Sequence, residues 1–219
     1  MLISDANRLL FIHVPKTGGV SIEGMLLDSC PDARKKFPDA QPPLGRHSTL
    51  TPVLKAEPQV NDYWIFGFVR NPWARLVSWY AMIEKWNHAY GPASGKPQDV
   101  KVGTMRDGNR MWRIVADYEG GFDEFVMRGT EELPRVRISQ ISYLRDAETG
   151  RQADFIGRTE QLADDMAVVQ ERLGIVPTPP PHRNKSGHGS YRDYYNDATR
   201  ARVAEVYAED IELFGYTYD

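Results

Sequence analysis

One stretch constrains the fold more than any other, the segment Leu9–Leu27, which reads LLFIHVPKTGGVSIEGMLL. Its first part, Leu9–Val14, is rich in strand formers and predicts a short buried strand that Pro15 ends. Lys16–Gly19 then forms a turn. From Val20 the apolar residues fall at helical spacing, so the turn leads directly into a helix.

A strand, a glycine turn and a helix in this order are typical of a phosphate-binding site. Backbone N–H groups at the start of a helix have no partner within it and carry the positive end of its dipole. Gly18 and Gly19 let a phosphate approach the main chain, Lys16 adds a mobile positive charge, and Thr17 and Ser21 add hydroxyl donors. The alternative is an ordinary strand-to-helix turn with an exposed lysine.

The order of residues in the turn differs from that of the common nucleotide sites. In a Walker A loop a glycine directly precedes the lysine, whereas here Lys16 comes before both glycines. The chain also lacks a Gly-x-Gly-x-x-Gly motif. The usual ATP or NAD site is therefore disfavoured.

Composition favours one globular domain over residues 1–219, with 41% hydrophobic and 26% charged residues. The absence of a long apolar stretch and of a signal-peptide pattern makes the cytoplasm the expected location. Cys30 is the one cysteine, so we expect no internal disulfide and a small buried residue at a helix end. The net charge of -3 argues against broad nucleic-acid binding, and no metal-ligand cluster is evident.

A second strand is predicted at Tyr63–Val69, YWIFGFV, whose continuous apolar character suggests burial on both faces, as in a parallel sheet between helices. Arg70 follows this strand, and Asn71-Pro72 opens a helix. Ligands of open α/β sheets bind beyond the carboxyl ends of strands, where both Lys16 and Arg70 would lie. This convergence of two basic groups favours a binding site.

The helix after Pro72 places Arg75 and Ser78 on one face, and its aromatic residues are expected in the core. His47 lies in a polar loop just ahead of a helix for which Thr51 is the expected cap. By itself His47 is as consistent with a surface histidine as with a catalytic base.

The rest of the chain alternates short elements with two loops, residues 90–110 and 178–190. The patterns predict helices at Met111–Tyr118 and Phe122–Arg128, a strand at Asp154–Gly157, a helix capped by Thr159 and ending at Gly174, and a last helix beginning at Asp197. Two groups of basic residues are either solvated charge or contacts for an acidic acceptor: Arg34–Lys36, and Arg128, Arg135, Arg137 and Arg145.

Together these residues resemble a known family. HVPKTGGVS followed by FVRNPWARLVSWY is similar to the paired nucleotide-binding elements of sulfotransferases, in the carbohydrate branch related to heparan and chondroitin sulfotransferases. FIGRTEQL, HRNKS and YAEDIELFGY resemble the same branch in the same order. The resemblance covers nearly the whole chain.

The resemblance implies a P-loop-like α/β fold with a central, mainly parallel sheet and the donor 3′-phosphoadenosine 5′-phosphosulfate (PAPS). Val20 departs from the threonine or serine that the family commonly has, which leaves the backbone N–H but removes a side-chain donor. His47 falls where this branch places its catalytic base. The implied contacts are Lys16, Thr17, Gly18, Gly19, Val20 and Ser21 around the 5′-phosphosulfate, Arg70 and Ser78 at the 3′-phosphate, and Arg183, Lys185 and Ser186 in a loop closing over the nucleotide.

The expected mechanism agrees with the chemistry of these side chains. His47 would take the proton of an acceptor hydroxyl, while Lys16 and the helix start would stabilise the departing 3′-phosphoadenosine 5′-phosphate (PAP). The mechanism needs no metal ion. If His47 is not the base, the substitutes are Glu23, Glu84 and His188.

Two other classes of function stay open at this point. A P-loop nucleotide kinase would share the strand, loop and helix, although the order of lysine and glycines and the absence of a Mg²⁺ pattern count against it. A non-catalytic nucleotide- or carbohydrate-binding module is the second. The family resemblance favours a glycan, glycolipid or glycosylated small molecule as acceptor, with peptide tyrosine or a small alcohol as alternatives. The sequence does not give the oligomeric state.

Overall fold

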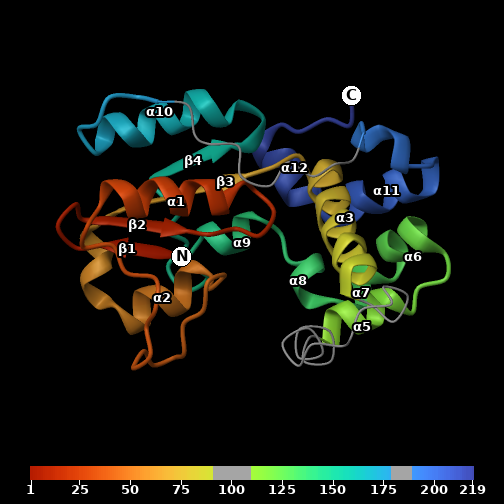
Figure 1. Cartoon of the computed structure of the whole chain (residues 1–219), viewed down its shortest axis with the longest axis horizontal. Coiled ribbons are helices and arrows are strands. Elements are labelled where there is room, and N and C mark those ends of the chain that lie inside the picture. Colours follow the sequence, from red (N-terminus) through yellow and green to blue (C-terminus); the bar gives the residue numbers. More distant parts are fainter. Residues whose placement is uncertain (91–109, 179–188) are drawn as a thin grey trace. The chain divides into compact units, whose positions relative to one another are not determined.

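The structure is a computed structural model that describes residues 1–90, 110–178 and 189–219 (Figure 1). The chain divides into two compact units, one of Met1–Asn71 with Ser139–Lys185 and one of Pro72–Ile138 with Ser186–Asp219. The single domain expected over residues 1–219 stays a prediction. The two expected loops lie almost entirely outside the described residues.

The first unit contains a four-stranded sheet in the order β1-β2-β3-β4 (Figure 1). β1 is antiparallel to β2, whereas β2, β3 and β4 are parallel to one another. The α/β class with a mainly parallel sheet is therefore confirmed, while β1 was not predicted. The strands are β1 (Leu2–Ser4), β2 (Leu9–Ile12), β3 (Trp64–Val69) and β4 (Phe155–Arg158).

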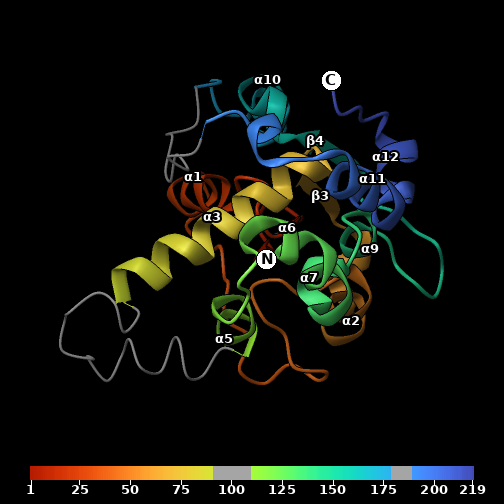
Figure 2. The ribbon, with the colours of Figure 1, turned by 90° about the vertical axis from the view of Figure 1, so that its right-hand side faces the viewer.

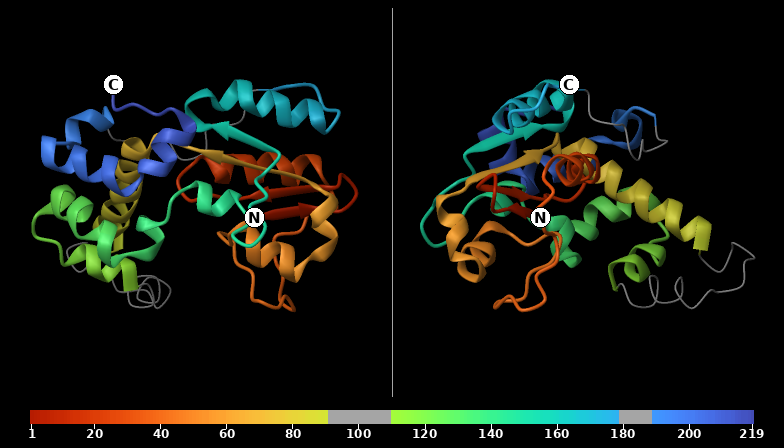
Figure 3. Two further views of the ribbon diagram at one scale, coloured as in Figure 1. Left: turned by 180° about the vertical axis from the view of Figure 1, so that it is seen from behind. Right: turned by 60° about the vertical axis from the view of Figure 1, so that its left-hand side comes forward.

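The helices of the first unit cover both faces of its sheet, as the apolar run of β3 predicts. Phe66 and Phe68 share a buried cluster with Ile22 from one helix and Met166 from another, so these two helices, α1 and α10, cover one face (Figure 3). On the other face, a Cβ built on Gly67 would lie 2.4 Å from the side chain of Leu144 in α9. The helical segments are α1 (Gly19–Ser29), α2 (Leu50–Ala56), the 3-10 helix η1 (Pro58–Asp62), α9 (Ile141–Leu144), the 3-10 helix η3 (Thr159–Gln161) and α10 (Leu162–Arg172).

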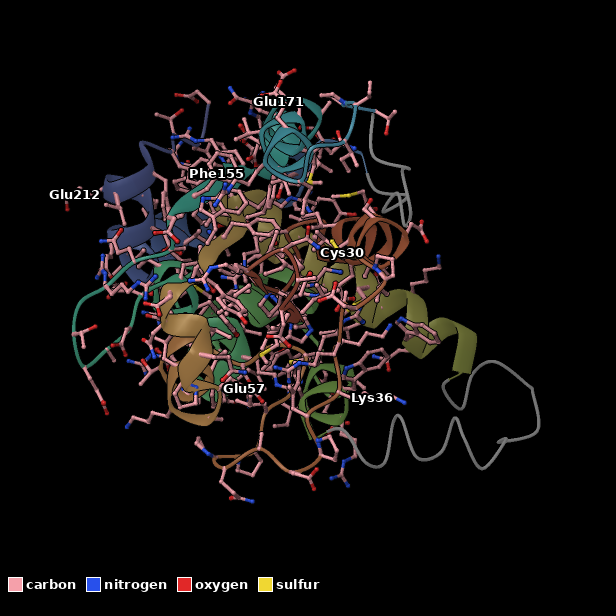
Figure 4. All side chains as sticks on the ribbon, turned by 90° about the vertical axis from the view of Figure 1, so that its left-hand side faces the viewer. Cys30, Lys36, Glu57, Phe155, Glu171 and Glu212 are labelled. Carbon is pink, nitrogen blue, oxygen red and sulfur yellow. The ribbon has the colours of Figure 1, made fainter. Side chains whose placement is uncertain are left out.

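Strand β2 ends two residues earlier than predicted. The N–H of Val14 donates to the carbonyl of Ile12 at 3.2 Å, so the chain turns out of the strand before Pro15 is reached. Helix α1 then starts at Gly19 and ends at Ser29, and Cys30 at its C-cap is buried, as expected (Figure 4).

Two of the predicted helix caps are wrong. Helix α2 begins at Leu50 with Thr49 at the N-cap, and the hydroxyl of Thr51 instead accepts a hydrogen bond from the N–H of Ala147 at 2.8 Å. Helix α10 has Gln161 at its N-cap. Thr159 lies in η3, where its hydroxyl donates to the carbonyl of Val69 at 3.0 Å. Both threonines therefore bond to distant backbone rather than to their own helices.

The second unit is helical in its described residues, with α6 and α11 packed against α3 (Figure 2). Trp73 and Trp79 of α3 are buried in its apolar cluster, so the prediction that these aromatics are core is confirmed. The last predicted helix does begin at Asp197, but Tyr207 separates it into two helices. The helical segments are α3 (Pro72–Tyr90), α5 (Arg110–Ala116), α6 (Gly121–Met127), α7 (Gly129–Glu132), α8 (Pro134–Arg137), the 3-10 helix η4 (Tyr191–Tyr194), α11 (Asp197–Val206) and α12 (Ala208–Phe214).

Among the described residues, none of the helices combines the length and the apolar character that crossing a membrane would require.

Candidate functional site

The turn between β2 and α1 presents the start of the helix without a side-chain cap. Gly18 occupies the N-cap position with a φ of 78°, a left-handed conformation that glycine adopts without strain, and no side chain caps the helix. The Thr17 hydroxyl donates to the carbonyl of Val14 at 2.9 Å, which holds the turn closed. The first N–H groups of α1 can therefore bind an anion.

Gly19 is needed for a different reason, the close approach of His13. A Cβ built on Gly19 would lie only 2.2 Å from Nε2 of His13, so a side chain at this position would displace the imidazole. His13 is itself buried, with 3% of its surface exposed. The buried imidazole therefore supports the turn from within the protein, a role that the sequence reasoning did not assign to it.

Lys16 and Arg70 lie together at the carboxyl ends of two neighbouring parallel strands, β2 and β3. Nη1 of Arg70 donates to the backbone carbonyl of Lys16 at 3.4 Å. Burial, and then the nearby charge of Arg70, lower the pKa of the Lys16 ammonium to about 8. The structure therefore brings together the two cations that the sequence places at one edge of the sheet.

His47 is held in one orientation by the backbone of His13. Its Nδ1 lies 2.8 Å from the His13 carbonyl, which can only accept, so Nδ1 carries the hydrogen and Nε2 keeps its lone pair. The two imidazole rings meet edge to face, with centroids 4.6 Å apart. Burial, followed by the charge of His13, lowers the pKa of His47 to about 3. At neutral pH the side chain is thus an uncharged base.

Arg46 and Glu23 tie the loop that carries His47 to helix α1. Nε of Arg46 donates to Oε1 of Glu23 at 3.3 Å, and the Arg46 guanidinium makes a second bond to the same carboxylate. Oε1 of Glu23 also lies 3.4 Å from Nδ1 of His13. Although burial raises the pKa of Glu23, its interactions with His13 and Arg46 lower that pKa to about 2. Both oxygens of the Glu23 carboxylate are thus engaged by Arg46, and Oε1 also lies close to His13, which argues against Glu23 as a substitute for His47.

The remaining predicted nucleotide contacts are placed as follows. Val20 is 38% exposed, while Ser21 is buried with its N–H donating to the Gly18 carbonyl at 3.0 Å. Ser78 is buried on α3 in the second unit, so its partnership with Arg70 stays a prediction. Arg183, Lys185 and Ser186 lie outside the described residues, as does the alternative base His188.

Glu84, the other alternative base, is exposed in the second unit and accepts a hydrogen bond from the Tyr80 hydroxyl at 3.2 Å. Within residues 1–90, 110–178 and 189–219, no group of three or more metal-ligating side chains could hold a metal ion.

Two of the basic residues considered as contacts for an acceptor, Arg128 and Arg34, form ion pairs with nearby carboxylates. Arg128 is exposed and pairs with Glu124 and Glu132 of its own unit. Arg34 pairs with Asp5 and Glu57, whereas the side chain of Lys36 is exposed on its loop (Figure 4). An acceptor groove lined by Arg128, Arg135, Arg137 and Arg145 stays a prediction.

Comparison with models of protein families shows the family to which the chain belongs. A model of the sulfotransferase family matches residues 1–217, so the chain belongs to the sulfotransferase family. Its activity is accordingly the transfer of a sulfuryl group to a hydroxyl-bearing acceptor. A search among individual curated proteins found no significant match.

Proposed function

We propose that the protein transfers the sulfuryl group of PAPS to a hydroxyl of a carbohydrate acceptor. One observation carries the proposal: Lys16 and Arg70 meet beside the uncapped start of α1, in the unit that also holds His47 with Nε2 unprotonated. The first two features suit an anionic nucleotide, and the third suits proton removal.

The start of α1 has the properties that the 5′-phosphosulfate requires. Gly18 and Gly19 leave room for the anion at the backbone, and Lys16 supplies a charge that burial leaves poorly solvated. Because the Thr17 hydroxyl already donates to Val14, Thr17 would contribute its backbone N–H rather than its side chain. Val20 and Ser21 in the first turn complete this part of the proposed site.

Arg70 would bind the 3′-phosphate of the same nucleotide, with Ser78 as a hydroxyl donor. A guanidinium presents several N–H donors in one plane and suits phosphate in two-bond geometry. Arg183, Lys185 and Ser186 are proposed to close over the bound nucleotide. These assignments rest on the family resemblance together with the position of Arg70 beside Lys16.

The reaction moves the sulfuryl group of PAPS from its phosphate oxygen to the acceptor oxygen, so that one S–O bond breaks, another forms and PAP leaves. His47 accepts the hydroxyl proton at Nε2, and its Nδ1–H···O bond to His13 keeps the ring in the required tautomer. The ammonium of Lys16 and the helix start stabilise the negative charge that grows on the leaving phosphate oxygen.

The carbohydrate nature of the acceptor and a cytoplasmic location are the finer parts of the proposal. The first rests on the similarity to the carbohydrate branch of the family, and the second on the composition of the sequence. An acceptor screen with labelled PAPS, read by the mass of the sulfated product, would identify the hydroxyl.

The proposal is tested by comparing wild type with Lys16→Ala and His47→Ala in the same screen. We expect His47→Ala to lower kcat by about 10²- to 10⁴-fold, the usual contribution of general-base catalysis, and Lys16→Ala to abolish measurable transfer. Both variants should retain much of the PAP affinity. Lys55→Ala, which removes an exposed lysine of α2 that the proposal does not use, is the matched control and should leave transfer unchanged.

Three results would contradict this proposal. Full activity of His47→Ala would remove His47 from the mechanism. Magnesium-dependent ATP turnover without PAP binding would indicate a nucleotide kinase instead. Binding of PAP without transfer to any acceptor in the screen would indicate a binding module.

A further inference from the structure

The backbone that carries Arg70 is held by side chains from two distant segments of the first unit. Strand β3 ends at Val69, so the backbone N–H and C=O groups that follow lie outside the sheet. Gln140 bonds to Arg70 on one side, and Thr159 and Glu160 bond to the neighbouring residues. The proposed phosphate-binding arginine thus starts from a fixed backbone.

Gln140 makes the most specific of these contacts. Its side-chain Oε1 accepts from the N–H of Arg70 at 2.8 Å, and its Nε2 donates to the carbonyl of Arg70, also at 2.8 Å. One amide therefore satisfies both main-chain groups of one residue, much as a neighbouring strand would. Gln140 is fully buried, with 0% of its surface exposed, so water does not compete for these bonds.

Thr159 and Glu160 hold the residues on either side of Arg70. The Thr159 hydroxyl donates to the carbonyl of Val69 at 3.0 Å, and Oε1 of Glu160 accepts from the N–H of Asn71 at 2.7 Å. Both belong to the FIGRTEQL segment, for which the proposed chemistry has no other use. Side chains thus fix the main chain before, at and after Arg70.

We propose that Gln140 is a positioning residue for nucleotide binding and acts only through Arg70. The inference rests on the proposed function, because it takes Arg70 as the group that binds the 3′-phosphate. Two-bond recognition of phosphate by a guanidinium depends on the direction from which the side chain leaves the backbone. Gln140 sets that direction and never touches the nucleotide.

The experiment measures, by calorimetry, the binding of PAP and of adenosine 5′-phosphate, which lacks the 3′-phosphate. Gln140→Met keeps a side chain of similar size but loses both hydrogen bonds to Arg70. We expect PAP to bind about tenfold more weakly, the size of effect that losing one charge-assisted hydrogen bond produces. Binding of adenosine 5′-phosphate should change by less than about twofold, because that ligand does not use Arg70.

A double-mutant cycle separates positioning from a general structural role. In an Arg70→Ala background, Gln140→Met should not weaken PAP binding any further, because the side chain that Gln140 positions is absent. Gln152→Met, the same substitution at an exposed glutamine of the first unit, is the control and should bind both nucleotides as wild type does.

Gln140→Glu provides a second variant if Gln140→Met does not fold. It keeps an acceptor for the Arg70 N–H and loses the donor to the Arg70 carbonyl, so it should also lose PAP affinity selectively. The inference is overturned if the folded variants bind PAP as wild type does, or if their affinities for PAP and for adenosine 5′-phosphate fall equally. It is also overturned if the Gln140 substitution lowers PAP affinity further in the Arg70→Ala background. If wild type itself fails to bind PAP, the proposed function fails instead.

Discussion

At the scale of single residues, the candidate site is defined by two side chains whose pKa values are shifted downward. Burial lowers the pKa of His47 to about 3 and that of Lys16 to about 8. In the proposed mechanism His47 acts in its neutral form and Lys16 in its charged form. The free enzyme therefore has both groups in the active state between these two values.

These two pKa values predict an asymmetric pH profile for kcat/KM, a parameter that reflects the ionisation of groups in the free enzyme. Because the base must be unprotonated and its pKa is lowered, activity should persist as the pH falls below 6.5, the ordinary value for histidine. Because the ammonium must be protonated, activity should fall as the pH rises through about 8. Initial rates with an acceptor that does not titrate in this range would measure both limbs.

The assignment of the alkaline limb can be checked with Lys16→Arg. A guanidinium stays protonated well above pH 8, so this variant should keep its reduced rate to higher pH than wild type. An acid limb near 6.5, or an alkaline limb that stays in place in Lys16→Arg, would contradict these roles.

At the scale of elements, the glycine turn is fixed jointly by β2, which leads to His13, and by α1, which begins with Gly19. Gly19→Ala would place a Cβ against the buried imidazole of His13, and we expect a loss of about 1–3 kcal/mol in the free energy of unfolding, as overpacking usually costs. Denaturant unfolding followed by circular dichroism would measure it. PAP affinity should fall as well, because the turn must move.

The partner in this clash is tested by repeating Gly19→Ala in a His13→Ala background. In that background Gly19→Ala should lower the free energy of unfolding by less, because the imidazole atoms that the new Cβ would displace are absent. Gly45→Ala is the control, because a Cβ built at Gly45 meets nothing within 4 Å. Equal costs of Gly19→Ala in the two backgrounds would show that His13 does not set the requirement for glycine.

The loop that carries His47 depends on a contact between elements, the pairing of Arg46 with Glu23 of α1. Glu23→Gln keeps the shape of the side chain and removes its charge, so the loop should be held less firmly. We expect kcat to fall about three- to tenfold, consistent with the net contribution of one ordinary hydrogen bond, with little change in PAP affinity. Steady-state kinetics combined with PAP calorimetry measures both. A weaker PAP affinity at unchanged kcat would contradict this role for Glu23.

Local signals account for the elements that the sequence predicted. β2, β3 and the start of α1 were predictable because their apolar runs, Pro15 and the glycines act within a few residues. The predicted caps Thr51 and Thr159 were wrong because their hydroxyls bond to Ala147 and Val69, far away in the sequence. Strand β1 was missed because three residues are too short to show a pattern.

The same distinction applies to the candidate site. Lys16 and Arg70 could be predicted to lie together because each follows a recognisable strand within a few residues. The supporting roles of His13, Glu23 and Gln140 could not, since each arises from contacts across the fold that no short motif encodes. Gln140, for instance, is 70 residues from Arg70 in the chain.

At the scale of the whole molecule, the family match covers both compact units, residues 1–217, while most of the proposed nucleotide contacts fall in the first. The strand ends, the start of α1 and His47 all belong to that unit, and Ser78 belongs to the second. The central claim is that Lys16 and Arg70 bind one nucleotide, with Arg70 at its 3′-phosphate.

The most direct test compares the affinities of PAP and adenosine 5′-phosphate for wild type and for Arg70→Ala. Wild type should prefer PAP by roughly ten- to a hundredfold, as charge-assisted phosphate contacts give, and Arg70→Ala should lose most of that preference while still binding adenosine 5′-phosphate. A full preference for PAP in Arg70→Ala would contradict the account.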